Sequence, residues 1–565
     1  MLPKRKSPRT PRAAPPGKLI KCGNSARGSL LNSATGNVLS HLHLILAFMR
    51  LDRALSTPIH NLPVETLSQI FVCLLTARDA STTFPLILRR VCKRWRAVAE
   101  QTPDIWTTLV TGHGIEWTRR SLDFSKKTPL DVTLHSQGSA VQRIELETLI
   151  LSRLYHIRTL VFTATAVPSE VARLFQAPAP LLQKLSINGE WARPSLDLGA
   201  SFVHTPPPQL THLRLAYARV PSTCPIFQAP LTHLRLIHCH VWDSVDSFID
   251  TLTSLPQLES FSTELALEDM SRQHDSDSSS SPSEEHCGER LAMARLRAIR
   301  LEETIDDLRV IMPRLTLPRD CEVYLAPLLF DVDFDLDDLL ASLDTICKPH
   351  LAASFQAGDN MDLTPRGFNR MEILEHEKEY RGCNPFTVTW TTTLNDTGHD
   401  DMRFRLAVII EHDDLLSEIV RHALEHWPGT STCISHLYLS HDSIFSEPGS
   451  LTNALEHLGA VTDLDAEGCA ARQLLETLYE SEGLIPGLES LTLRNLRLTD
   501  SAYQACISEM EARRVEIRDP EMRIPRKLTL VNCTVMGKAL TRMDVVLSED
   551  ASGEDEEEGS SEEDW

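Results

Sequence analysis

The amino-acid sequence predicts an α/β protein with a short helical module near its N-terminus, a long repeat array and disordered ends. Three observations support this expectation. The chain has 565 residues, which is more than one hydrophobic core usually organises. Apolar residues recur at helical spacing between residues 59 and 110. From about residue 150 to 540 a leucine pattern returns again and again, as it does in stacked repeats.

The two ends of the chain carry opposite charge. Residues 1–35 contain Lys and Arg but no acid, whereas residues 549–565 contain ten acidic residues and no Lys or Arg. Such segments bury too little apolar surface to fold, so a disordered basic tail and a disordered acidic tail are expected. Ser552, Ser560 and Ser561 each have an acid three residues later. They are candidate sites for acid-directed kinases, and the alternative is a plain solubilising tail.

A helical module is expected over residues 36–110. Pro63 suits the first turn of a helix that Asn61 would cap. Four apolar residues then follow at i, i+3, i+4 and i+7, namely Leu67, Ile70, Phe71 and Leu74. A polar hinge at residues 76–83 leads to a second, basic helix, with apolar residues Leu88, Val91, Cys92, Trp95, Val98 and Ala99. The pattern alone is also compatible with a plain helical hairpin that buries both stripes.

The detailed string over residues 62–106 resembles the F-box family, in its fungal form. The resemblance rests on Leu62-Pro63-x-Glu65-x-Leu67-x-x-Ile70-Phe71, on Val91-Cys92-Lys93-x-Trp95 and on Thr102-Pro103-x-Ile105-Trp106. In that family the module packs on the Skp-family linker protein of cullin ubiquitin ligases. The resemblance therefore implies linker-facing or module-packing roles for Leu62, Pro63, Glu65, Leu67, Ile70, Phe71, Val91, Cys92 and Trp95. The chain departs from the family at residues 76–83, where the connection is longer and more polar.

Residues 125–545 are expected to form an irregular array of repeats. The pattern L-x-x-L-x-L is seen at Ile157/Leu160/Phe162, Leu182/Leu185/Ile187, Leu210/Leu213/Leu215, Leu231/Leu234/Leu236, Leu296/Ile299/Leu301, Ile434/Leu437/Leu439, Val461/Leu464/Ala466, Leu488/Leu491/Leu493 and, in part, Leu528/Leu530. Most intervals between clear copies are 21 to 28 residues. This period resembles leucine-rich repeats, in which each strand is buried only by its neighbours. An α/β leucine-rich-repeat solenoid is predicted, with helices at residues 245–255, 472–484 and 502–513.

The cysteines fit this array. The chain has 13 cysteines and no CxxC pair, which argues against a disulfide scaffold or a zinc ribbon and favours a reducing compartment. Cytoplasmic or nuclear localisation is therefore expected. Cys239, Cys469 and Cys533 occupy the ninth position of their repeats, where Asn or Cys normally turns inward. They are interpreted as structural residues of the array rather than as nucleophiles or ligands.

Two stretches interrupt the pattern. A Ser-rich and acidic insert at about residues 270–290 is expected to be disordered. From residue 317 to about 427 the repeat is hard to follow, although residues 386–390 and 404–410 alternate like strands and residues 415–427 like a helix. The array either continues there with distorted repeats or is interrupted by an insertion.

No motif for phosphate binding, hydrolysis or calcium binding is found along the chain. His233, His238, Cys239 and His240 are close in sequence, but successive residues of a strand point to opposite faces. Cys239 would therefore point away from His238 and His240, and a structural role is favoured over a metal site. Glu411-His-Asp-Asp414 lies where Asp would cap a helix. The protein is thus expected to be no enzyme and to need no metal or cofactor.

Membrane and nucleic-acid partners are also not expected. The longest apolar run, at about residues 38–49, is shorter than the roughly 20 residues that cross a bilayer. The formal net charge of −22 opposes phosphate binding. The leading functional hypothesis is a substrate adaptor that links a bound protein to a cullin ubiquitin ligase through a Skp-family linker. The alternatives are a repeat scaffold whose module caps the first repeat, and an enzyme with an unrecognised site in residues 317–430.

Overall fold

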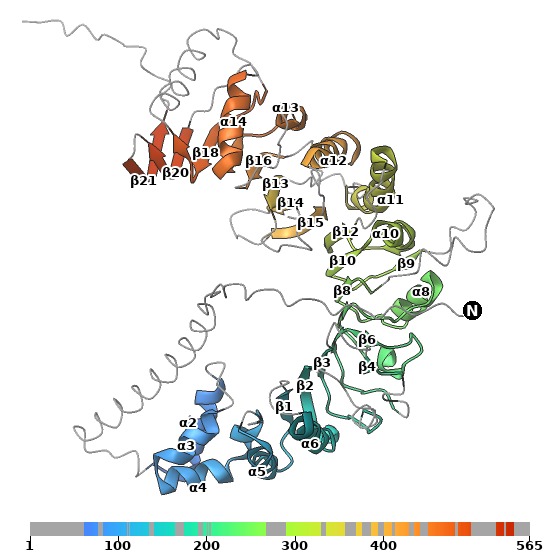
Figure 1. The fold of residues 1–565 in the computed structure, drawn as a ribbon, viewed down its shortest axis with the longest axis vertical. Helices are drawn as coiled ribbons and strands as arrows, with labels where there is room; N and C mark the ends of the chain where they lie inside the picture. Colours follow the sequence, from blue (N-terminus) through green and yellow to red (C-terminus); the bar gives the residue numbers. More distant parts are fainter. Residues whose placement is uncertain are drawn as a thin grey trace, which may run out of the picture. The chain divides into compact units, whose positions relative to one another are not determined.

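The computed structural model describes residues 62–76, 83–109, 111, 113–134, 140–163, 175–189, 196–199, 202, 205–266, 290–328, 335–355, 369–375, 386–393, 400–408, 413–428, 434–440, 450–480, 484–498, 527–535 and 538–546. Outside them lie both predicted tails, Asn61, residues 77–82 of the hinge, the Ser/acid insert and the predicted helix at 502–513. The chain divides into two compact units, residues 1–105 and 106–565, which are drawn in Figure 1.

Where the structure describes the first unit, its α-helices are α2 (Val64–Thr76), α3 (Phe84–Val91) and α4 (Lys93–Gln101). The second helix predicted from the sequence is therefore two helices, because Cys92 is extended, with φ −160° and ψ 172°. Its Sγ accepts a hydrogen bond from the Trp95 N–H at 3.4 Å and so caps α4. Pro63 lies just before the first turn of α2, and its carbonyl accepts from the Leu67 N–H at 3.1 Å.

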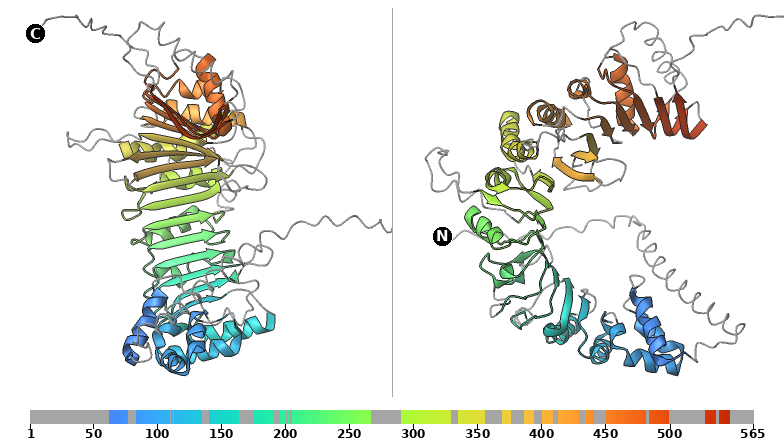
Figure 2. Two further views of the ribbon diagram at one scale, coloured as in Figure 1. Left: turned by 90° about the vertical axis from the view of Figure 1, so that its left-hand side faces the viewer. Right: turned by 180° about the vertical axis from the view of Figure 1, so that it is seen from behind.

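The second unit is built on a large, mostly parallel sheet. After α5 (Ile115–Ser125), the first strands are β1 (Leu130–Leu134), β2 (Ile157–Thr163), β3 (Lys184–Asn188), β5 (His212–Ala216), β7 (His233–Ile237), β8 (Ser260–Glu264), β10 (Ala298–Thr304) and β12 (Glu322–Leu328). Each pairs in parallel with the next. The strands lie side by side in chain order (Figure 2, left).

The register of this sheet aligns the predicted leucine positions. From β2 to β12, consecutive partners are Leu160, Leu185, Leu213, Leu234, Phe261, Ile299 and Val323, all at most 6% exposed. They face a layer of helices on one side of the sheet, α6 (Ala140–Leu151), α8 (Val245–Thr253), α10 (Ile305–Ile311) and α11 (Leu336–Phe355) (Figures 1 and 2). The predicted helix at 245–255 is thus present as α8.

The obscure region from 317 to 427 continues the same sheet in an unexpected way. Its strands β13 (Arg370–Glu375), β14 (Phe386–Thr393) and β15 (Asp400–Val408) form an antiparallel meander. The last of them, β15, pairs in parallel with β12, whereas β13 pairs in parallel with β16 (His436–Leu439). The meander is therefore inserted in reverse spatial order, and α12 (Asp413–His426) carries the chain back past it to β16.

Beyond the meander the parallel ladder resumes. β16 is followed by β17 (Asp463–Glu467), β18 (Ser490–Arg494) and β20 (Lys527–Val535), and the last strand, β21 (Lys538–Val546), is antiparallel. The helices described in this stretch are α13 (Ser450–Leu455) and α14 (Gly468–Glu480). Short strands elsewhere in this unit are β4 (Leu196–Asp197), β6 (Ala218–Arg219), β9 (Leu291–Ala292), β11 (Leu315–Thr316) and β19 (Arg497–Leu498).

The ninth-position cysteines do not share one environment. Cys239 and Cys533 are each 1% exposed, and burial raises the pKa of the Cys239 thiol to about 11. Cys469 is exposed, so its predicted inward position is wrong. The reason is Gly468, whose φ of +62° turns β17 directly into α14, so that Cys469 lies in the first turn of a helix.

A left-handed residue recurs at the eighth position of the repeats. It is found at Tyr217, His238, Leu265, Asn495 and Asn532, with φ between 46° and 55°. This conformation is uncommon for residues other than glycine. The left-handed residue ends the regular strand, so the side chains after it no longer alternate between the two faces of the sheet. The His238 ring stacks on the Tyr217 ring, with centroids 4.9 Å apart, and His240 is exposed.

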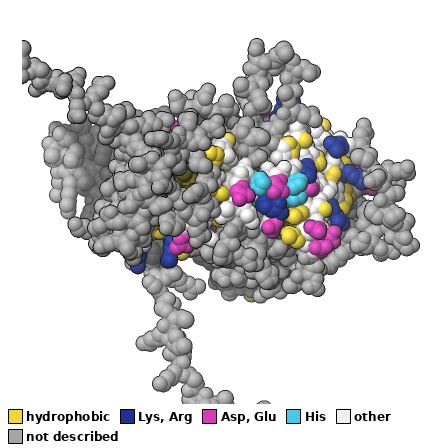
Figure 3. All heavy atoms as spheres, turned by 90° about the horizontal axis from the view of Figure 1, so that it is seen from above, with side chains coloured by type: hydrophobic (Ala, Val, Ile, Leu, Met, Phe, Trp, Pro, Cys, Tyr) yellow, Lys and Arg dark blue, Asp and Glu magenta, His cyan; other side chains and the backbone are white. Residues whose placement is uncertain are grey.

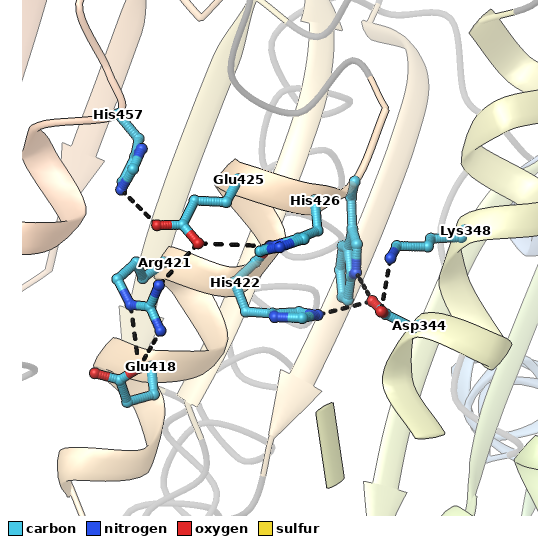
Figure 4. A network of polar contacts seen from close by, with 9 residues as sticks. Asp344, Lys348, Glu418, Arg421, His422, Glu425, His426 and His457 are labelled. Carbon is cyan, nitrogen blue, oxygen red and sulfur yellow. Dashed lines mark hydrogen bonds and ion pairs between the residues drawn. The ribbon is translucent and has the colours of Figure 1, made fainter. Parts of the chain in front are cut away.

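A polar network joins α11 to α12 and to the segment after α13 (Figure 4). Asp344 accepts hydrogen bonds from Lys348 at 2.6 Å, His422 at 2.8 Å and Trp427 at 2.8 Å. Burial opposes ionisation of Asp344, but these three donors lower its carboxyl pKa overall. On the face drawn in Figure 3, side chains of Asp or Glu, of Lys or Arg and of His are close neighbours.

Candidate partner-binding site

Three of the nine residues predicted for the partner-binding face form the interior of the first unit. Leu67 and Phe71 are fully buried, and Trp95 is 7% exposed. The Phe71 and Trp95 rings are 5.0 Å apart, centroid to centroid. Their spacing brings them together, because Leu67 and Phe71 lie one turn apart on α2 while α4 presents Trp95 to the same side. These residues pack the module and do not offer contact surface.

Polar contacts fix the helices around this interior. Arg89 of α3 pairs with Glu100 of α4 at 2.5 Å. The Ser68 hydroxyl is hydrogen-bonded to that of Thr102 at 2.9 Å. Arg94 donates to the Leu62 carbonyl, which holds the Leu-Pro turn before α2 against α4.

The exposed part of the module is apolar at both ends of α2. Val64 is 43% exposed and Leu74 is 48% exposed. With Leu67 and Phe71 they form one stripe at i, i+3, i+7 and i+10, buried in its middle and open at its ends. An exposed apolar residue at each end of the stripe is a candidate contact point for a partner. Leu74, which the sequence places in the apolar stripe of this helix, is thus at the open end of that stripe.

The other predicted residues are at least partly accessible to solvent. Pro63 and Glu65 are exposed, and four are half-buried, namely Leu62, Ile70, Val91 and Cys92. Val64 and Leu74 were not among the predicted contact residues. The sequence signal that could have found Val64 is its position three residues before Leu67, which extends the apolar stripe by one turn.

The described surface of the module offers apolar side chains on α2 and positive charge on α3 and α4. Arg90, Lys93 and Arg96 are exposed on α3 and α4. Among the residues that the structure describes, no group of His, Cys, Asp and Glu has the arrangement of a metal site. Within the same residues, no helix combines the length and the apolar character needed to span a membrane. Glu411 and His412, part of the second candidate cluster, lie outside the described residues.

Comparison with known proteins assigns this unit. The family model described as F-box-like matches residues 59–111, a stretch that contains α2, α3 and α4 and all nine predicted positions. A search of curated proteins gave no match to the chain. The F-box resemblance noted in the sequence is thus confirmed for the module, while its fungal type is not tested. Residues 59–111 of this chain are an F-box-like domain.

Proposed function

We propose that the protein is a substrate adaptor, which binds a Skp-family linker through the F-box-like domain and presents a bound protein to a cullin ubiquitin ligase. The observation that carries the proposal is the family match at residues 59–111, together with the exposed apolar ends of α2 within it. In this role the chain itself performs no chemistry.

The division of the module into interior and surface suits such a role. The buried contact between Phe71 and Trp95 holds α2 and α4 in a fixed arrangement. Val64 and Leu74 then remain available to a partner. Binding through a few desolvated apolar anchors is typical of protein interfaces, and the exposed basic residues of α3 and α4 favour an acidic partner surface.

We also propose that the sheet of the second unit is a degenerate leucine-rich-repeat array that holds the substrate. Its support is the aligned leucine register from β2 to β12, the recurrent left-handed eighth residue and the buried ninth-position cysteines Cys239 and Cys533. The described cysteines are free thiols, as a cytoplasmic or nuclear adaptor would require.

Co-purification of the full chain with a Skp-family linker tests the adaptor proposal. The variant Val64→Glu/Leu74→Glu places charge at both exposed ends of the stripe, so linker retention is expected to fall by about tenfold or more. The variant Leu62→Ala/Pro63→Ala removes the turn that Arg94 holds, and a smaller loss is expected. The control is Val141→Glu, since Val141 is 75% exposed and lies on α6, outside the module.

The outcomes separate the adaptor from a scaffold that has no ligase. If wild-type chain retains no linker, the adaptor proposal is wrong and the module serves as a cap for the repeat array. If wild type and Val64→Glu/Leu74→Glu retain it equally, the linker binds elsewhere. Circular dichroism of each variant establishes that the module is still folded.

A further inference from the structure

Four arginines align across the sheet face opposite the helices. Arg214 of β5 is paired with Arg235 of β7, and the same line continues through Ser262, Arg300, Tyr324 and Arg405. We call Arg214, Arg235, Arg300 and Arg405 the arginine row. The leucines that alternate with them are buried on the helix side, so the row faces away from that core.

Neighbouring acidic side chains compensate the charge of the arginine row only in part. Within the described parts of the chain, Arg214 and Arg235 form no ion pair, and the Nε atoms of Arg235 and Arg405 are buried without a hydrogen-bond partner. Arg300 is the exception, because it pairs with Glu302 at 2.5 Å. Burial, followed by the charges of Arg214 and Arg300, lowers the pKa of the Arg235 guanidinium. An arriving anion would relieve this repulsion.

The row lies in a groove rather than on a flat surface. The groove has a volume of about 400 Å³ and is lined by strands from β3 to β15. Tyr324 forms part of its wall, with the Arg300 guanidinium 4.2 Å and the Arg405 guanidinium 5.9 Å from the ring centroid. Next to the row, His212 and His233 stack at 4.1 Å, and Lys184 is the register partner of His212.

The length of the arginine row indicates the length of a ligand that could contact all of it. Five strand-to-strand steps separate β5 from β15, which at roughly 4.8 Å each is about 24 Å. An extended chain rises by about 3.4 Å per residue, so the row matches about seven residues that run across the strands. Guanidinium groups bind carboxylates and phosphates in two-pronged hydrogen bonds, so the matching side chains are acidic.

We propose that this groove binds an extended acidic segment, about seven residues long, of the protein that the chain recruits. As a statement about substrates the proposal rests on the adaptor function, but peptide binding itself does not require the linker. The occupant is a peptide rather than a nucleic acid, because the strip of positive charge is narrow. Glu322 borders it on one side, and Glu264 and Glu302 border it on the other, so the positive charge is confined to a line about one side chain wide.

Fluorescence anisotropy with the full chain, in the absence of linker, tests this proposal. The probe is a fluorescein-labelled seven-residue peptide of alternating Glu and Ser, and a Gln/Ser peptide is the uncharged comparison. Binding of the acidic probe alone is expected, and it should weaken as salt rises. The variant Arg214→Gln/Arg235→Gln should lose about tenfold or more in affinity. Arg472→Gln removes an exposed charge from α14, outside the groove, and should change nothing.

Several results would overturn the proposal. Equal binding of both peptides, or equal affinity of wild type and Arg214→Gln/Arg235→Gln, would exclude the arginine row as the site. The single variant Arg214→Gln serves if the double variant does not fold, since Arg214 is exposed and tolerates replacement. Tighter binding of a single-stranded RNA heptamer would assign the groove to nucleic acid.

The acidic tail of the chain is the competing occupant. A full-length variant in which the ten acids of residues 549–565 are replaced by Gln or Asn removes this competitor. Unchanged probe affinity is expected. An affinity gain of about tenfold would instead assign the groove to the tail. Linker co-purification is measured in a separate experiment. A failure of the adaptor proposal can therefore be distinguished from a failure of the groove proposal.

Discussion

The parallel strands β2 to β12 and the meander β13 to β15 belong to the same sheet but are arranged by different rules. From β2 to β12 every strand is parallel and in sequential order, and a buried apolar residue of one strand pairs with that of the next. From β13 to β15 the order is reversed and the pairing is antiparallel. The comparison shows that a continuous sheet does not need a continuous repeat, because backbone hydrogen bonds can join strands that run parallel or antiparallel.

The two stretches also differ in what holds their cores. The parallel stretch distributes its stability over a ladder of similar leucines, so each strand depends on its nearest neighbours. The meander concentrates its stability in an aromatic cluster. The ring centroid of Trp390 in β14 lies 5.7 Å from that of Phe404 and 6.1 Å from that of Trp427. Loss of one side chain should therefore be felt more widely in the meander.

Trp390→Ala should have the largest effect. Trp390 is 1% exposed, and its removal leaves a cavity that costs about 3 to 5 kcal/mol. Hydrogen exchange should then rise in β13, β14, β15 and α12 together. In Leu234→Ala, in the parallel stretch, the increase should stay within β5, β7 and β8. Exchange that is confined to β14 in Trp390→Ala would contradict the concentrated core.

The pH dependence of stability should identify His350 of α11. His350 is 8% exposed and donates to the Met312 carbonyl at 3.0 Å, and burial lowers its pKa to about 4. The unfolded chain takes up this proton near pH 6.5, so the free energy of unfolding has its full value above that pH. It should fall by about 3 kcal/mol as the pH drops toward 4. Urea unfolding of wild type and His350→Gln from pH 7 to 4 measures this, and equal slopes would refute it.

Gly189→Ala tests the close approach of neighbouring strands in the parallel stretch. A Cβ at Gly189 would lie 2.8 Å from the Tyr217 carbonyl oxygen and 3.0 Å from that of Ala216. Because backbone atoms cannot easily move away, a loss of about 2 kcal/mol is expected in urea unfolding. Gly459→Ala is the matched control, since its Cβ would meet nothing within 4 Å. A similar loss in both variants would show that the effect is not steric.

Asp344→Asn should have the smallest effect. Its carboxylate is about a quarter exposed, so a loss of about 1 kcal/mol is expected at neutral pH. Because the three donors lower the carboxyl pKa, this stability is present above the unfolded value of 3.8 and is lost as the pH falls below it. The wild-type advantage over Asp344→Asn should thus disappear near pH 3. An advantage that persists there would assign the effect to packing rather than charge.

Local patterns predicted the elements that local forces decide. The apolar spacing of Leu67 and Phe71 predicted α2, and the leucine pattern predicted β2, β3, β5, β7 and β10, because side-chain period and burial are properties of neighbouring residues. The break at Cys92 and the outward position of Cys469 were not predicted. Both depend on single backbone angles that propensity does not specify.

Strand order and surface assignment needed the tertiary structure. The sequence by itself determined that this chain has an F-box-like string at residues 62–106, a leucine periodicity and charged ends. Only the fold decided that Leu67, Phe71 and Trp95 are interior while Val64 and Leu74 are exposed. It alone aligned arginines that are 21 to 191 residues apart in the chain. The physical reason is that parallel strands pair residues that are remote in sequence. The periodicity of a strand predicts which of its side chains are buried, but it does not predict which strand lies next to it.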